Sequence, residues 1–332
     1  MKRDTSIDFI KGMLIWGVVY GHVISVLLMG RTHEMVWLHT FLRTFDMPFF
    51  MVLSGHFLRK SLCHNGCLRV MMNRCTMILV PIVVWTLIRG QTNIFGEMYY
   101  FLWAVLVGSA ICVIAYGVGN VVPFPGSYIV EGSILGGAVV YSHLCEVPWN
   151  FFYLFPFFVA GYYASHLPKL YRGWLEVVLL FSLITGLCFW RVQYTPWNLT
   201  GVAWQKDAVV IVLYVYRFCL GLLGVHVMWK VYAGLRECLG EENSIVTLIT
   251  TAGGKTLQIY ILHILILSAV RRIISVIPLP PILFASTSII GYVIAPLVSI
   301  LIIAALLPAI ELSKNFVLMK YSLGFKVKQV QG

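Results

Sequence analysis

The sequence predicts an all-α membrane protein, a polytopic bundle of about ten transmembrane helices. Three observations lead to this fold class: 60% of the 332 residues are hydrophobic, only 11% are charged, and long apolar runs recur along the chain. An ordinary soluble domain carries about 25% charged residues. The mean hydropathy of +0.87 indicates that lipid surrounds most of the chain. An ordinary soluble fold is therefore excluded.

The apolar runs define the expected elements in order, at about 20 residues for each crossing of the hydrocarbon core. The first run follows Asp4 directly and has no small-residue cleavage site, so it is expected to remain as a helix rather than act as a removable signal peptide. Three later spans are short or interrupted by Gly and Pro, which favours tilted, broken or re-entrant segments. These are 75–90, 128–143 and 149–166, and the other spans are 7–29, 36–58, 98–118, 174–190, 208–229, 255–273 and 282–309.

The distribution of Lys and Arg predicts the topology, because cytoplasmic loops carry the excess of these residues. With a cytoplasmic N-terminus, fifteen of the 24 fall in inner segments, six fall in outer segments and three lie within spans. Both termini are therefore expected in the cytoplasm, and the chain is expected to cross the inner membrane many times. The net charge of +11 then needs no nucleic-acid partner. No soluble domain remains, so one domain over residues 1–332 is expected, with a basic tail from about residue 312.

Cysteine spacing indicates neither a disulfide framework nor a metal site. The eight cysteines are scattered without a C-x-x-C pair. Cys63, His64, Cys67 and Cys75 form the one cluster of ligand types, and its spacing matches no standard zinc site.

Charged side chains within spans mark the candidate site, since each costs about 2.5–3.5 kcal/mol to insert at the membrane centre. Lys11 and His22 are eleven residues apart. This spacing puts both on one helix face, with His22 roughly 16 Å deeper. In the second span His39, Arg43 and Asp46 fall at i, i+4 and i+7, on one polar stripe. An antiparallel hairpin would bring His22 and Arg43 level.

Polar residues in the eighth and ninth spans extend this candidate site. Each candidate residue also has a purely structural interpretation. Arg217 in the eighth span reaches a similar level, so polar groups from three helices could converge there, in a reaction or transport site. Tyr260 and His263 lie at i and i+3 in the ninth span and face together. A membrane His also serves as a hydrogen-bonding partner between helices, and a buried Arg pairs with an acid whatever its purpose. Lys11 could simply snorkel to the inner interface.

Several fragments, in order, resemble the family-3 integral-membrane acyltransferases, which modify cell-surface glycans. The opening carries Arg3, IDFIKG at 7–12 and VVYGH at 18–22, in which a basic residue (Lys11) precedes a His (His22) by ten intervening positions, as in the family signature. The opening and MPFF at 47–50 most resemble the branch related to fucose O-acetylases, where a His commonly stands at the position of Asp46. The other fragments are FDMPFF at 45–50, LSG at 53–55, a basic stretch with Arg69 and Arg74 leading to Pro81 and Trp85, FLW at 101–103, FPFFVAG at 155–161 and GGKTLQIYILH at 253–263.

The resemblance implies a membrane O-acyltransferase, in the first instance an O-acetyltransferase. His22 would act as the general base or as the acyl carrier, because an imidazole accepts a proton near neutral pH. Asp46 would orient its ring, and Arg43 or Arg217 would stabilise the developing oxyanion.

The implied donor is cytoplasmic acetyl-CoA, used as a substrate, with no permanently bound cofactor. Arg69 and Arg74 offer charged hydrogen bonds to its phosphates, whereas Arg59 and Lys60 fit ordinary positive-inside topology. Lys11 could contact the pantetheine or phosphate end of the donor. Tyr260 and His263 would contact substrate or form a helix-packing hydrogen bond. The implied acceptor is a hydroxyl of a cell-surface polysaccharide or lipid-linked sugar.

Other functions remain open at the level of sequence. A transporter or flippase for glycans would also place charges at the midplane and use Gly- and Pro-broken helices. Another donor such as succinyl-CoA, or an inactive scaffold with the same fold, fits the same residues. The sequence leaves the acceptor sugar and the oligomeric state undetermined.

Overall fold

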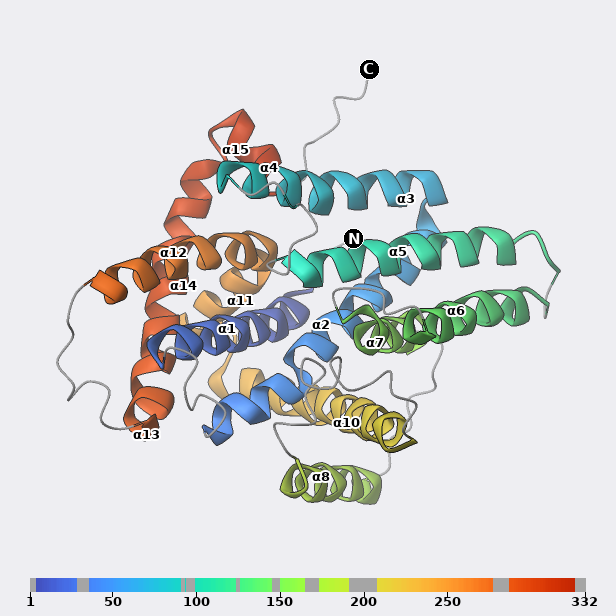
Figure 1. Cartoon of the computed structure of the whole chain (residues 1–332), viewed down its shortest axis with the longest axis horizontal. Helices are drawn as coiled ribbons and strands as arrows, with labels where there is room; N and C mark the ends of the chain where they lie inside the picture. Colours follow the sequence, from blue (N-terminus) through green and yellow to red (C-terminus); the bar gives the residue numbers. More distant parts are fainter. Residues whose placement is uncertain are drawn as a thin grey trace. The chain divides into compact units, whose positions relative to one another are not determined.

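The computed structural model describes residues 4–28, 36–90, 93, 99–123, 126–144, 150–164, 173–190, 208–276 and 287–325. The elements in these ranges are helices, and no strand occurs among them (Figure 1). The predicted all-α fold class is therefore confirmed. The end of the predicted basic tail, 326–332, lies outside the described residues.

Each of the ten predicted spans contains a helix. The first elements are α1 (Thr5–Leu27), α2 (Trp37–His64), α3 (Cys67–Arg74), the π-helix η2 (Cys75–Leu79), α4 (Val80–Ile88), α5 (Tyr100–Gly119), α6 (Gly126–Leu144), α7 (Phe151–Ala164) and α8 (Gly173–Cys188). The later ones are α10 (Ala208–Leu239), α11 (Ser244–Gly254), α12 (Thr256–Val276), α13 (Thr287–Ile289), the π-helix η6 (Ile290–Ile294), α14 (Ala295–Ser313) and α15 (Val317–Ser322).

Long apolar helices confirm that the chain is a membrane protein. Within the described ranges, five stretches are long and apolar enough to cross a membrane: Thr5–Leu27, Cys67–Ile88, Tyr100–Gly119, Ile211–Leu239 and Thr287–Ser313. Ser244–Gly254 and Thr256–Arg272, which meet at a bend of 87°, form a sixth candidate. The count of ten spans and the cytoplasmic termini stay predictions.

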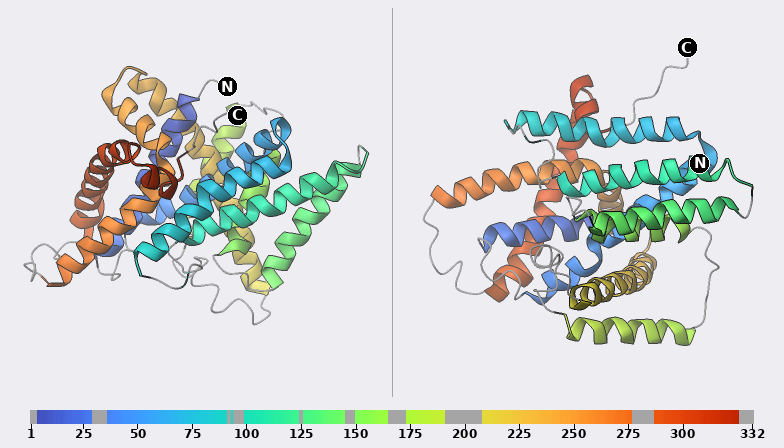
Figure 2. Two further views of the ribbon diagram at one scale, coloured as in Figure 1. Left: turned by 90° about the horizontal axis from the view of Figure 1, so that it is seen from above. Right: turned by 45° about the vertical axis from the view of Figure 1, so that its right-hand side comes forward.

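The chain forms two compact units, which are described separately. The first unit contains Met1–Asp46, Leu179–Val192 and Leu223–Leu323, and the second contains Met47–Val178, Gln193–Leu222 and Gly324–Gly332. In the first unit α1 packs against α11, α12 and α14 (Figures 1 and 2). In the second unit α5 runs beside α6, and both contact α7. The expectation of one domain over residues 1–332 stays a prediction.

Glycines allow α1 and α11 to approach until their backbones touch. A Cβ atom added to Gly12 would overlap the carbonyl oxygen of Ile249, and one added to Gly253 would overlap the carbonyl oxygen of Asp8. Small residues at such crossings are typical of helix pairs in membranes. The chain bends by 87° just after this crossing. As a result, α12 begins beside α1 and contacts it further along.

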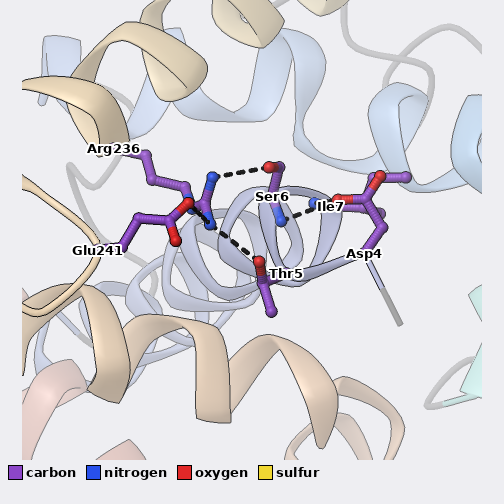
Figure 3. A network of polar contacts seen from close by, with 6 residues as sticks. All are labelled: Asp4, Thr5, Ser6, Ile7, Arg236 and Glu241. Atoms are coloured by element: carbon purple, nitrogen blue, oxygen red, sulfur yellow. Dashed lines mark hydrogen bonds and ion pairs between the residues drawn. The ribbon is translucent and has the colours of Figure 1, made fainter. Parts of the chain in front are cut away.

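A polar network holds the end of the first unit where α1 begins, called here the N-terminal end (Figure 3). Arg236 of α10 donates hydrogen bonds from Nη1 to Ser6 Oγ at 2.7 Å and from Nη2 to Thr5 Oγ1 at 2.8 Å. Its Nη2 also pairs with Glu241 at 2.8 Å. Asp4 Oδ1 caps α1 by accepting the backbone N–H of Ser6 at 3.0 Å. The first turn of α1 is therefore fixed to the end of α10.

The far end of the first unit, where α1 ends and α2 begins, is held by tyrosines. Tyr20 Oη donates to the carbonyl oxygen of Gly291 at 3.0 Å, and the backbone N–H of Trp37 donates to Tyr292 Oη at 3.0 Å. Gly291 and Tyr292 belong to the π-helix η6, a geometry that often occurs at functional sites. Both ends of α1 are thus anchored to neighbouring helices.

The second unit contains a buried ion pair that the sequence did not predict. Arg59 Nη1 donates to Glu131 Oε1 and to Tyr162 Oη, both at 2.6 Å, and Tyr162 Oη donates to the same carboxylate. The Arg59 guanidinium also lies 4.9 Å from the ring of Tyr116 and 4.8 Å from that of Tyr162. Arg59 therefore forms a buried link between α2, α5, α6 and α7. Its predicted position on the cytoplasmic side stays a prediction.

Candidate active site

Two histidines from different helices face each other inside the first unit. The ring centroids of His22 on α1 and His263 on α12 are 5.2 Å apart, and the ring planes are inclined by 50°. The His22 side chain is exposed, whereas His263 is fully buried. The bend between α11 and α12 allows this meeting, because it turns α12 along α1 beyond the Gly12 crossing.

The hydrogen bond of His263 determines which of its ring nitrogens is basic. Its Nδ1 lies 2.9 Å from the carbonyl oxygen of Ile259, one turn earlier on α12. A carbonyl oxygen only accepts, so the tautomer that makes this bond carries its proton on Nδ1. Nε2 then keeps a free lone pair, and within the described ranges this buried atom has no hydrogen-bond partner. Tyr260 packs at the edge of the ring, with centroids 5.8 Å apart.

Helix α2 adds a positive charge and a third histidine. His22 interacts electrostatically with His263, Arg43 and His39. Arg43 is exposed, and His39 is buried against Tyr20 with centroids 6.4 Å apart. The structure thus brings together His22, Arg43, His39 and His263.

Asp46 and Lys11, the other sequence candidates of the first unit, have neighbours of their own. Asp46 is buried and interacts with Tyr232 of α10. Its predicted role in orienting His22 stays a prediction. Lys11 Nζ lies 3.9 Å from Asp8 Oδ1, at the i, i+3 spacing that allows contact on a helix. Asp8 is not among the predicted site residues, although its i, i+3 spacing to Lys11 was a usable signal.

The remaining candidates lie in the second unit. Arg217 on α10 is buried. Arg69 on α3 is exposed, and the half-buried Arg74 donates from Nη2 to the carbonyl oxygen of Ser54 at 3.5 Å. Arg69 therefore keeps its donors available at the surface of the second unit.

The described residues offer proton-transfer and nucleophilic groups at this site. No group of three or more His, Cys, Asp or Glu side chains that could hold a metal ion occurs within the part of the chain that the structure describes. The chemistry available at the His22 and His263 pair is proton transfer or nucleophilic attack by imidazole, beside the positive charge of Arg43.

Comparison with known proteins finds one family model that is similar to the first part of the chain. Residues 4–90 match the family model of an acyltransferase domain. This range includes Lys11, His22, Arg43 and Asp46 but not His263. Over residues 4–90, the resemblance to family-3 acyltransferases that the ordered fragments indicated is confirmed.

Two curated relatives share a longer stretch of the chain. The nodulation protein NolL of Sinorhizobium fredii is 27% identical over 242 residues, which cover 64% of this chain and 64% of the relative. The protein of the same name in Mesorhizobium japonicum is 24% identical over 228 residues, 59% of each chain. The matched stretches thus span less than two thirds of these relatives. No solved structure matches the chain.

Proposed function

We propose that this chain, whose residues 4–90 match the family-3 acyltransferase domain, is a membrane O-acyltransferase. Its donor in this proposal is acetyl-CoA, and its acceptor is a hydroxyl of a cell-surface polysaccharide or lipid-linked sugar at the cell membrane. The pairing of an exposed His22 with a buried His263, 5.2 Å away by ring centroids, supports this proposal most directly.

The two histidines suit the proton transfers of acyl transfer. The imidazole of His22 accepts the proton of the sugar hydroxyl while the hydroxyl oxygen attacks the thioester carbonyl carbon. The carbon–sulfur bond then breaks, and the imidazolium returns the proton to the departing thiolate. His22 takes the substrate-contacting role because its side chain is exposed. His263 is proposed as a positioning residue, since its Nε2 keeps a lone pair that can accept the other N–H of His22.

Arg43 provides the electrostatic part of the mechanism. Negative charge develops on the carbonyl oxygen as the hydroxyl attacks, and a fixed cation beside that oxygen lowers the barrier. Arg43 interacts with His22 and is exposed, so it can reach a substrate at the same ring. A covalent route, in which His22 first takes the acyl group and then passes it to the sugar, uses the same side chains.

The donor is proposed to enter at basic side chains. Arg69, exposed on α3, offers a planar guanidinium to the phosphates of acetyl-CoA. Arg74 and Lys11 are proposed to contact the donor as well. Lys11 lies eleven residues before His22 on α1, a separation of roughly 16 Å along the helix. An extended pantetheine arm suits such a separation between the phosphates and the thioester.

A glycan transporter or flippase is the second candidate function. The 87° break between α11 and α12 favours it, because transporters use discontinuous helices near the bilayer midplane. The donor distinguishes the two functions. Saturable hydrolysis or transfer of acetyl-CoA by the purified protein supports the enzyme, whereas transport of sugar without regard to an acyl donor supports the transporter.

The most direct test compares surface glycans from cells with and without the chain. The expected result is loss of one acyl group from one sugar, which identifies donor and acceptor together. Unchanged acylation of every glycan, together with no acyl transfer by the purified protein in bilayer nanodiscs, would refute the proposed function.

A further inference from the structure

The acidic residues described in the first unit gather at one of its two ends. The N-terminal end is tied together by Asp4, Arg236 and the pair of Lys255 Nζ with Glu311 Oε2 at 2.6 Å. Apart from the buried Asp46, the described acidic residues of this unit belong to that end. They are Asp4, Asp8, Glu237, Glu241, Glu242 and Glu311.

The other half of the first unit carries arginines instead. Arg43 lies near the start of α2, and Arg271 and Arg272 lie near the end of α12. All three side chains are exposed. The predicted topology puts this far end outside the cell, where Lys and Arg are usually depleted. The positive-inside rule therefore does not explain why these arginines lie at this end of the unit.

One face of α12 connects Arg271 to the histidine pair. His263, Leu267 and Arg271 follow at i, i+4 and i+8, the spacing of one helix face. The first two are buried, and the face emerges at the exposed Arg271. Eight residues of α-helix place Arg271 roughly 12 Å beyond His263. Arg43, which interacts with His22, adds a second cation next to the histidines.

We propose that Arg271 binds an anionic group of the acceptor, a phosphate or carboxylate that lies a few sugar units from the acylated hydroxyl. This inference rests on the proposed function and names the class of its acceptor: a glycan that carries negative charge. Guanidinium groups form paired, charge-assisted hydrogen bonds with phosphate and carboxylate. A phospholipid headgroup offers the same chemistry, so the test must separate the two sources.

Binding to a matched pair of glycolipids tests the proposal without requiring catalysis. The probes are dodecyl glucoside and glucosyl dodecyl phosphate, which share sugar and chain and differ by the phosphate. Equilibrium binding is measured with the full chain in phosphatidylcholine nanodiscs. We expect at least tenfold tighter binding of the phosphate-bearing probe. The variant Arg271→Gln should lose this preference, and Arg271→Lys should keep most of it.

A control variant, and nanodiscs that also contain phosphatidylglycerol, show whether the arginine site recognises the glycan or a lipid headgroup. Lys60→Gln removes an exposed charge of the second unit and should leave the preference intact. Equal binding of both probes, or a preference that survives Arg271→Gln, overturns the proposal. The proposal is also overturned if Arg271→Gln alters only the response to added phosphatidylglycerol, which would assign this arginine to lipid headgroups. A chain that shows the preference but transfers no acyl group refutes the proposed function and leaves the anion site in place.

Discussion

His263 presents a buried Nε2 on the helix that faces His22, with the two ring centroids 5.2 Å apart. The pair is asymmetric, because His22 is exposed whereas His263 is fully buried and bonded through Nδ1 to its own helix. A substrate can therefore reach the first ring, and the second ring can support it from behind. The two histidines should respond differently to mutation.

His22→Ala should abolish glycan acylation, since removal of a general base typically lowers the rate by about 10²–10⁴-fold. His263→Ala should lower kcat by a smaller factor and leave the KM values close to those of the parent. Acyl transfer by protein in nanodiscs measures both. His64→Ala is the matched control, because His64 is exposed and bonds to the carbonyl oxygen of Lys60. Retention of a tenth or more of the parental rate by correctly inserted His22→Ala would rule out the assigned role.

Arg69→Gln combined with Arg74→Gln should raise the KM for acetyl-CoA much more than the KM for the acceptor. The reason is the loss of charge-assisted hydrogen bonds to the donor phosphates. Initial rates at varied donor and acceptor concentrations give the two values. Unchanged donor dependence in protein that inserts normally would leave these arginines with a topological role only.

Glu131→Gln should destabilise the protein strongly, because it leaves the buried Arg59 without its counter-charge. Removal of one partner of a buried ion pair typically costs about 3–5 kcal/mol. Thermal unfolding in detergent measures the loss, and Glu242→Gln, at an exposed position, is the control. Replacing Arg59 and Glu131 together by Met should recover much of the stability. A Tm equal to that of the parent would contradict the structural role of this pair.

Gly12→Ala should prevent the close crossing of α1 and α11, since its Cβ atom would overlap the carbonyl oxygen of Ile249. The backbones would have to separate, and overpacking of this kind typically costs about 1–3 kcal/mol. Both Tm and acyl transfer should fall. Gly137→Ala is the matched helical control, because nothing lies within 4 Å of an added Cβ there. A Gly12→Ala protein as stable as Gly137→Ala would argue against a tight crossing.

A reporter fused after Lys328 should be active only in the cytoplasm, and reporters inserted near Arg31 or Arg191 only on the outer side. The reason is the excess of Lys and Arg in the predicted inner segments. An outer C-terminus would mean that the number of spans is wrong by an odd number.

Helical spacing was enough to predict part of the site. Lys11 and His22 share one face of α1, and the i, i+4 spacing put His39 and Arg43 on one stripe of α2. The meeting of His22 with His263 could not be predicted in this way. It depends on the 87° bend after α11, and periodicity within a helix carries no information on the angle between helices.

Two other features were missed for physical reasons. The pairing of Arg59 with Glu131 joins residues 72 positions apart, although an isolated acid in the apolar run 128–143 was a usable signal. Helix α11 was left between predicted spans, because it is too short to cross a bilayer alone. Its N-cap was visible in the sequence: Asn243 Oδ1 accepts the backbone N–H of Ile245 at 2.8 Å.

The anchoring of α1 at both ends bears on which group moves in the proposed acyl transfer. Arg236 forms hydrogen bonds with the first turn of this helix, and the Tyr20 hydroxyl forms one with η6 at the other end. The helix that carries His22 therefore has little freedom to slide along its axis. A histidine on such a helix cannot shuttle between the two faces of the membrane. In the proposed mechanism the thioester and the sugar would both have to travel to this histidine, so mutations around the site would slow the entry of a substrate rather than a movement of the imidazole.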